Sequence, residues 1–137
     1  MNWTVEAPKP SQIVRTKVKF YYHYGIFVSE DEVIQFGLPN DPGKPSEQIK
    51  VLSTDVYTFL NGGQLETAVP DKDERKRMLK ADEIIKIARS KIGEGGYDIL
   101  HNNCEHFVNK CVFGKSSSSF LDGVREKIRQ KLTDSHK

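Results

Sequence analysis

Residues 101–111, with the sequence HNNCEHFVNKC, concentrate side chains that can bind metals, exchange electrons or attack carbonyl groups. The segment contains both cysteines of the chain, Cys104 and Cys111. It lacks the CxxC or HxxxH spacing that directs ligands onto one zinc ion, and the sequence has no second ligand pair. On a helix the two cysteines would lie about 10 Å apart, too far for a disulfide. Two interpretations of Cys104 then remain: a small buried core residue, or a nucleophile, which needs no metal or organic cofactor.

The cysteines lie in a segment with helical periodicity. Apolar residues at positions i, i+3, i+4 and i+7 predict a helix over 102–114: Cys104, Phe107, Val108 and Cys111. Asn102 or Asn103 would cap its start. Cys104 would then lie in the first turn, where free N–H groups and the helix dipole favour a thiolate and can hold an oxyanion. Cys111 lacks these advantages and is expected to be a core residue.

A cysteine nucleophile needs a base, and His23 is the best placed of the four histidines. It lies within a strand-like segment between aromatic residues. His136 is near the end of the chain, His106 points to another side of the cysteine helix, and His101 precedes the cap. As an alternative, His23 could be a core histidine with no catalytic task.

The spacing of the following strand suggests a partner for this histidine. If residues 29–31 form a three-residue loop, residue 25 pairs with 35, and Gln35 lies diagonal to His23 on the same sheet face, within about 7–8 Å. Gly25, opposite Gln35, would leave room for their contact. A four-residue loop would turn Gln35 to the other face. Gln35 could therefore orient His23, or it could be a strand amide bonded to solvent or backbone.

The surrounding elements predict an α+β fold, an antiparallel β-sheet packed against helices. Extended segments are expected at residues 12–20, 21–28, 32–37 and 64–69, and 49–60 should be a strand entering a helical turn. The proline-rich segment 38–48 should be a loop, 71–80 a charged loop or helix entry, 81–93 a helix, and 97–100 a short extended piece.

Bulk composition narrows the function classes. A chain of 137 residues is long enough for one domain with a core. The net charge of +2, with acidic and basic residues interspersed, gives no indication of nucleic-acid binding. The sequence has neither a signal-peptide pattern nor an apolar run of about 18 residues. With its expected free thiols, the protein is predicted to be cytoplasmic.

The last part of the chain has a different composition. We expect a domain over residues 1–114, followed by a serine hinge and a basic amphipathic helix over 115–137. Residues 119–132 carry an apolar stripe that could contact a membrane peripherally or pack on the domain itself.

Two stretches resemble a known family. HYGIFVSEDEVIQFG at 23–37 and NNCEHFVNKCVFG at 102–114, with STDVYTFLNG between them, resemble the lecithin:retinol acyltransferase-like family. That family includes small phospholipid-metabolising acyltransferases, and the resemblance spans about residues 11–114. It implies a circularly permuted papain-like fold, in which the histidine strand precedes the cysteine helix.

The resemblance also implies an activity and roles for residues. Cys104 matches the family's nucleophile and His23 its general base and acid. The third family position is usually a second histidine, twelve residues after the first, where this chain has Gln35. The family transfers an acyl group from a glycerophospholipid to the cysteine as a thioester, and then to water or another acceptor. A phospholipase A or acyltransferase acting on phospholipid is therefore expected.

Two other functions remain open from the sequence. The deSUMOylating-isopeptidase-like family shares the permuted plan and a similar cysteine motif, so a thiol isopeptidase or amidase is an alternative. Gln35 in place of histidine would also suit a non-catalytic member that binds lipid or a protein partner. The continuation Glu105-His106-Phe107-Val108 favours the acyltransferase.

Overall fold

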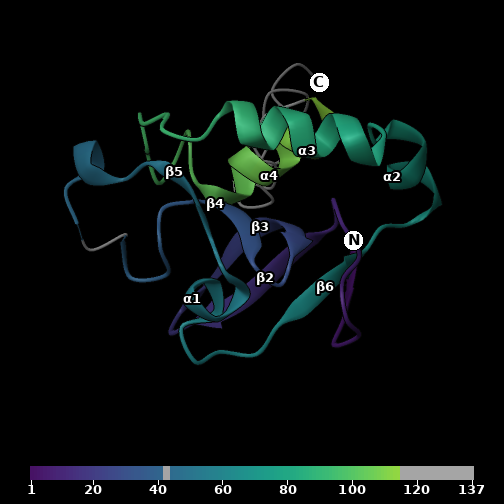
Figure 1. Ribbon diagram of the computed structural model, residues 1–137, viewed down its shortest axis with the longest axis horizontal. Coiled ribbons are helices and arrows are strands. Elements are labelled where there is room, and N and C mark those ends of the chain that lie inside the picture. Colours follow the sequence, from purple (N-terminus) through teal and green to yellow (C-terminus); the bar gives the residue numbers. More distant parts are fainter. Residues whose placement is uncertain (42–43, 115–137) are drawn as a thin grey trace, which may run out of the picture.

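The computed structural model describes residues 1–41 and 44–114, which form one sheet with helices on both faces (Figure 1). The strands are β1 (Asn2–Thr4), β2 (Ile13–Val18), β3 (Tyr21–Ser29), β4 (Glu32–Phe36), β5 (Val51–Thr54) and β6 (Glu66–Val69). The helices are α1 (Val56–Leu60), α2 (Lys72–Arg77), α3 (Ala81–Ser90) and α4 (Cys104–Phe113), with a short 3₁₀ turn at Ser46–Gln48. The predicted α+β class with an antiparallel sheet is confirmed.

The sheet has the strand order β1-β6-β2-β3-β4-β5, and every pairing is antiparallel. Gly25 pairs with Gln35, as predicted. The hairpin differs in detail: Ser29 pairs with Glu32 across a two-residue turn, and a bulge between Phe27 and Ser29 restores the expected register. A bulge adds one residue to one strand, so the shorter turn leaves Gln35 on the predicted face.

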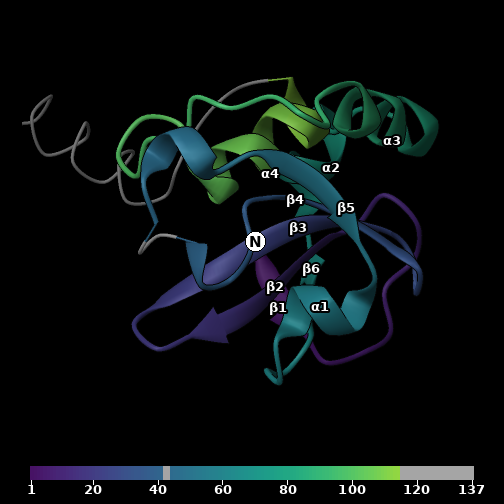
Figure 2. The same cartoon turned by 60° about the vertical axis from the view of Figure 1, so that its left-hand side comes forward.

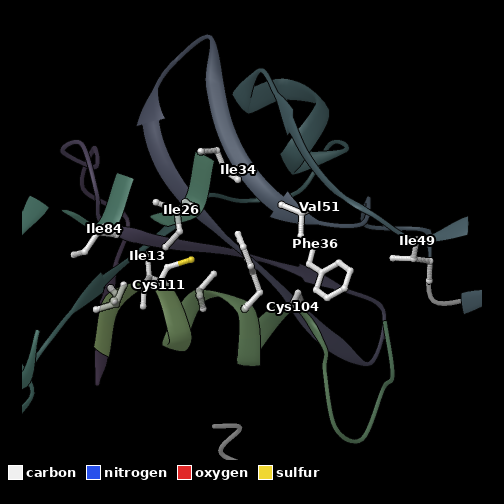
Figure 3. Close-up of a cluster of buried hydrophobic side chains, with 14 residues drawn as sticks. Ile13, Ile26, Ile34, Phe36, Ile49, Val51, Ile84, Cys104 and Cys111 are labelled. Carbon is white, nitrogen blue, oxygen red and sulfur yellow. The ribbon is translucent and has the colours of Figure 1, made fainter. Parts of the chain in front are cut away.

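Two groups of buried side chains cover the two faces of the sheet. Side chains of α3 and α4 pack on one face together with Ile13, Ile26, Ile34 and Phe36, and Figure 3 shows both cysteines among them. On the other face, Val56 and Phe59 of α1 pack against Val14, Phe27 and Val33. Figures 1 and 2 show α1 and α4 on opposite sides of the central strands. The strands that carry His23 and Gln35 are therefore fixed from both sides.

Most predicted elements are present, with shifted ends. The helix expected at 81–93 is α3, and the charged run contains α2, whose capping box joins Asp71 and Glu74. Residues 97–100 are not extended: Asp98 pairs with Asn102 in an isolated bridge, and its carboxylate accepts from the N–H of Leu100 at 2.9 Å. The three-residue β1 was not predicted. The predicted helix at 119–132 lies outside the described residues.

No helix within residues 1–41 and 44–114 has the length and apolar character needed to cross a bilayer.

Candidate active site

His23 and Gln35 lie next to each other in the interior of the sheet. Atom Nε2 of His23 and Oε1 of Gln35 are 2.7 Å apart, and the two side chains are 2% and 0% exposed. The ring of Phe59 packs on the imidazole at 5.3 Å between centroids. Gly25 is the reason that this packing fits, because a Cβ there would come within 2.9 Å of both Phe59 and Val33. The predicted neighbourhood of His23, Gln35 and Gly25 is present.

The amide of Gln35 continues into a second hydrogen bond. Its Nε2 donates to Oγ1 of Thr54 at 2.6 Å, and the Thr54 hydroxyl donates to the carbonyl of Asp55 at 2.9 Å. With its N–H group turned to Thr54, Gln35 offers His23 an oxygen, which only accepts. With the amide in this orientation, His23 donates from Nε2, and the neutral ring then has its lone pair on Nδ1.

Cys104 is the first residue of α4, as the helical spacing predicted. Asn103 is the N-cap, and its side-chain oxygen accepts from the N–H groups of Glu105 and His106, each at 3.0 Å. In return, Nδ1 of His106 accepts from the backbone N–H of Asn103 at 3.1 Å. His106 thus closes the capping box from the third helical position, a structural role that its sequence position did not predict.

The sulfur of Cys104 lies against the backbone of β3 on both sides of His23. Its hydrogen bond goes to the carbonyl of Tyr22 at 4.0 Å, and the N–H of Tyr24 also interacts with it, in the sense that lowers the pKa of the thiol. The backbone N–H and carbonyl of Phe27 form hydrogen bonds on the β2 side of β3, and the direction of these groups alternates from residue to residue. The backbone groups of Tyr22 and Tyr24 therefore point to the β4 side. The last residue of β3 that pairs with β4 at this end is Gly25. The sulfur therefore lies beyond that pair, next to the stretch of backbone that carries His23.

Burial controls the protonation of the nucleophile candidate. Cys104 is 7% exposed, and its burial raises the pKa of the thiol to about 11, although the N–H groups of Tyr24, Cys104 and Glu105 lower it. The helix start was expected to favour a thiolate; desolvation outweighs that effect here, because burial disfavours the charged form. Cys111 is fully buried in the core, as expected, and burial raises its thiol pKa to about 12.

The imidazole is also held neutral. Burial lowers the pKa of His23 below its ordinary value of 6.5, and the hydrogen bond to Gln35, the charge of Asp41 and the carbonyl of Gly37 oppose that shift. Asp41 was not among the predicted site residues. Its carboxylate is 7% exposed, accepts from the N–H of Leu38 at 2.6 Å and pairs with Lys44 at 3.1 Å. The resting pair is thus a thiol and a neutral imidazole.

Within residues 1–41 and 44–114, no three or more His, Cys, Asp or Glu side chains are grouped so that they could hold a metal ion. The two cysteines are free thiols.

Comparison with known proteins identifies related sequences. The family described as lecithin retinol acyltransferase matches residues 6–117. Human phospholipase A and acyltransferase 3 is 28% identical over 137 residues, covering 93% of this chain and 83% of the relative. Human phospholipase A and acyltransferase 4 is 27% identical, covering 90% and 80%. Mouse lecithin retinol acyltransferase is 30% identical over 80% of this chain but only 58% of its own length. The chain belongs to the lecithin retinol acyltransferase family.

Proposed function

We propose that this protein is a cysteine-dependent phospholipase A or acyltransferase, with Cys104 as nucleophile, His23 as general base and acid, and Gln35 as the group that orients His23. The observation that carries the proposal is the approach of the Cys104 sulfur to the backbone on both sides of His23, whose imidazole is already bonded to Gln35. A nucleophile, a base and an orienter for the base are the parts that thiol acyl transfer requires.

In the first step, the thiol of Cys104 attacks the ester carbonyl carbon of a glycerophospholipid. Because the pKa of the thiol is about 11, the proton must leave as the carbon–sulfur bond forms, and Nδ1 of His23 accepts it. The hydrogen bond to the Tyr22 carbonyl is released in this step. The tetrahedral oxyanion is held at the start of α4, where the N–H of Cys104 is a donor that the cap does not use, whereas the cap takes those of Glu105 and His106.

In the second step, the oxyanion collapses and the bond to the glycerol oxygen breaks. The imidazolium of His23 gives its proton to that oxygen, so that a lysophospholipid leaves and an acyl thioester remains on Cys104. Water or another acceptor then attacks the thioester, with His23 again taking a proton. The carbon–sulfur bond breaks, the acyl group leaves on the acceptor, and His23 returns the proton to the sulfur of Cys104. The charge of Asp41 supports the imidazolium formed in each step.

A phospholipid substrate is supported by the relatives, which are named phospholipase A and acyltransferase or lecithin retinol acyltransferase. We further propose peripheral contact with the lipid surface. Phe20 is 98% exposed at the turn before β3, beside exposed Lys17 and Lys19, and precedes Tyr22 by two residues. The free thiols suit a reducing compartment such as the cytoplasm.

The test is turnover of a mixed-chain phosphatidylcholine by the purified full chain, with products measured by mass spectrometry. Lysophospholipid and free fatty acid, or an acylated acceptor, should appear with the wild type and disappear with Cys104→Ala. Cys111→Ala is the matched control, because it removes the other buried thiol from the same helix. Cleavage of a ubiquitin-like conjugate without lipid turnover would instead support an isopeptidase. Lipid binding without turnover would support a non-catalytic member.

A further inference from the structure

The amide of Gln35 creates an orientation problem that a second histidine at this position would not have. The two ends of an amide have nearly the same shape but opposite hydrogen-bonding character. With the oxygen toward His23, Nε2 of the imidazole must carry the proton and Nδ1 keeps its lone pair. With the NH₂ group toward His23, Nε2 must accept and the proton moves to Nδ1. Only the first arrangement leaves Nδ1 able to take a proton.

We propose that Thr54 is a positioning residue that fixes the orientation of the Gln35 amide and thereby the tautomer of His23. The geometry is a chain of three hydrogen bonds: His23 to Gln35 at 2.7 Å, Gln35 to Thr54 at 2.6 Å, and Thr54 to the carbonyl of Asp55 at 2.9 Å. The proposal rests on the proposed function only for its effect on rate.

The Asp55 carbonyl sets the donor and acceptor roles in these three hydrogen bonds. The carbonyl of Asp55 can only accept, so the Thr54 hydroxyl, which has one hydrogen, donates there and accepts from Gln35. If the amide turned around, the Thr54 hydroxyl would have to donate to Gln35 and leave Asp55. That arrangement has one hydrogen bond fewer. The bond that is lost joins the Thr54 hydroxyl to the Asp55 carbonyl, so the preference for the observed orientation depends on the hydroxyl of Thr54.

Helix α1 holds Asp55, the last acceptor in this series of hydrogen bonds, in place. Asp55 is its N-cap: the carboxylate accepts from the N–H of Thr58 at 2.7 Å and the carbonyl accepts from the N–H of Phe59 at 3.2 Å. The ring of Phe59 packs on His23. Helix α1 therefore helps to orient the imidazole in two ways: directly, through the contact of Phe59, and indirectly, through the hydrogen bonds by way of Thr54. Thr54 ends β5, the edge strand next to β4, and is reached diagonally from Gln35.

The test compares Thr54→Val and Thr54→Ser with the wild-type full chain. Valine keeps the β-branched shape and removes the hydroxyl, whereas serine keeps the hydroxyl. The matched control is Thr67→Val on β6, which removes a buried hydroxyl that donates to the Glu6 carbonyl at 2.9 Å, away from this chain of bonds. Thermal unfolding checks that each variant is folded.

The deciding measurement is the protonated nitrogen of His23, assigned by two-dimensional ¹H–¹⁵N NMR on the imidazole ring. We expect the Nε2–H tautomer alone in the wild type, Thr54→Ser and Thr67→Val, and a mixture with the Nδ1–H tautomer in Thr54→Val. Along with this change of tautomer, kcat should fall severalfold in Thr54→Val while KM changes little. Thr54→Ser should keep the kcat of the wild type. A single Nε2–H tautomer in Thr54→Val would overturn the proposal. A mixed tautomer with unchanged turnover would uphold it and contradict His23 as the base.

Discussion

The imidazole of His23 and the amide of Gln35 form a hydrogen bond of 2.7 Å between adjacent strands, with both side chains shielded from water. A hydrogen bond in such surroundings is stronger than one at the surface, and losing either partner leaves a buried polar group unsatisfied. A neutral amide orients the imidazole without adding negative charge. In this protein, the carboxylate of Asp41 supplies the charge that favours the imidazolium.

The pH dependence of catalysis should reflect a neutral thiol and a neutral imidazole. Because the pKa of His23 is lowered, its base form persists below pH 6.5, so the acid limb of kcat/KM should lie below that value.

Alkylation of Cys104 by iodoacetamide, measured in Cys111→Ala, should keep accelerating above pH 9.0, because the thiol pKa is raised to about 11. A rate of alkylation that is already constant near neutral pH would indicate a preformed thiolate and contradict this picture.

Replacing Gln35 with glutamate should move that acid limb to higher pH. A carboxylate beside the imidazole favours the charged ring, so the pKa of His23 should rise by about one unit or more. Thr54 can turn its hydroxyl to donate to the new carboxylate, which keeps the group hydrogen-bonded. The kcat/KM profiles of Gln35→Glu and the wild type provide the comparison, and an unchanged acid limb would mean that the titrating group is not His23.

Gly25→Ala should destabilise the protein. The added Cβ would come within 2.9 Å of Phe59 and of Val33, both packed in the core, so side chains must move. Overpacking of this kind costs about 1–3 kcal/mol of unfolding free energy, measured by chemical denaturation. Gly95→Ala is the control, because its nearest neighbour is the flexible end of Lys50. Equal stability of the two variants would refute the tight packing inferred around His23.

Phe20 should matter for lipid surfaces and not for dissolved substrates. Inserting an exposed phenylalanine ring into a bilayer contributes about 1.5 kcal/mol or more, roughly tenfold in binding. Phe20→Ser should therefore weaken binding and turnover on vesicles containing phosphatidylcholine and anionic lipid, and leave hydrolysis of a monomeric short-chain ester unchanged. Tyr57→Ser, which alters a 76% exposed aromatic residue on α1, is the control. Similar vesicle binding by both variants would exclude Phe20 as a contact.

The sequence was sufficient to place His23, Gln35 and Gly25 together, because a two-residue period leaves few registers once the hairpin is located. The predicted register is reached with a different turn, because a bulge after Phe27 takes the place of one loop residue. No residue type in that segment predicts the bulge. Helix α4 and its asparagine cap were also predictable, because the helical spacing and capping chemistry are local.

Features set by tertiary packing could not be predicted. Thr54 reaches Gln35 only through the β4–β5 register, which depends on the long loop between these strands. Burial of Cys104 under the β3 backbone reverses the pKa expected for a cysteine at a helix start, and burial is not a local property. Asp98 caps a turn in the segment expected to be extended, because its side chain offers the backbone an alternative to a strand.

Trapping of the acyl group on one cysteine would show directly whether Cys104 is the nucleophile. Wild type, Cys104→Ala and Cys111→Ala are each mixed with mixed-chain phosphatidylcholine, quenched in acid within the first turnover, and mapped by peptide mass spectrometry. We expect a hydroxylamine-sensitive fatty-acyl adduct on Cys104 in the wild type and in Cys111→Ala, and none in Cys104→Ala. Phospholipid turnover that persists in Cys104→Ala, or an adduct confined to Cys111, would contradict this expectation.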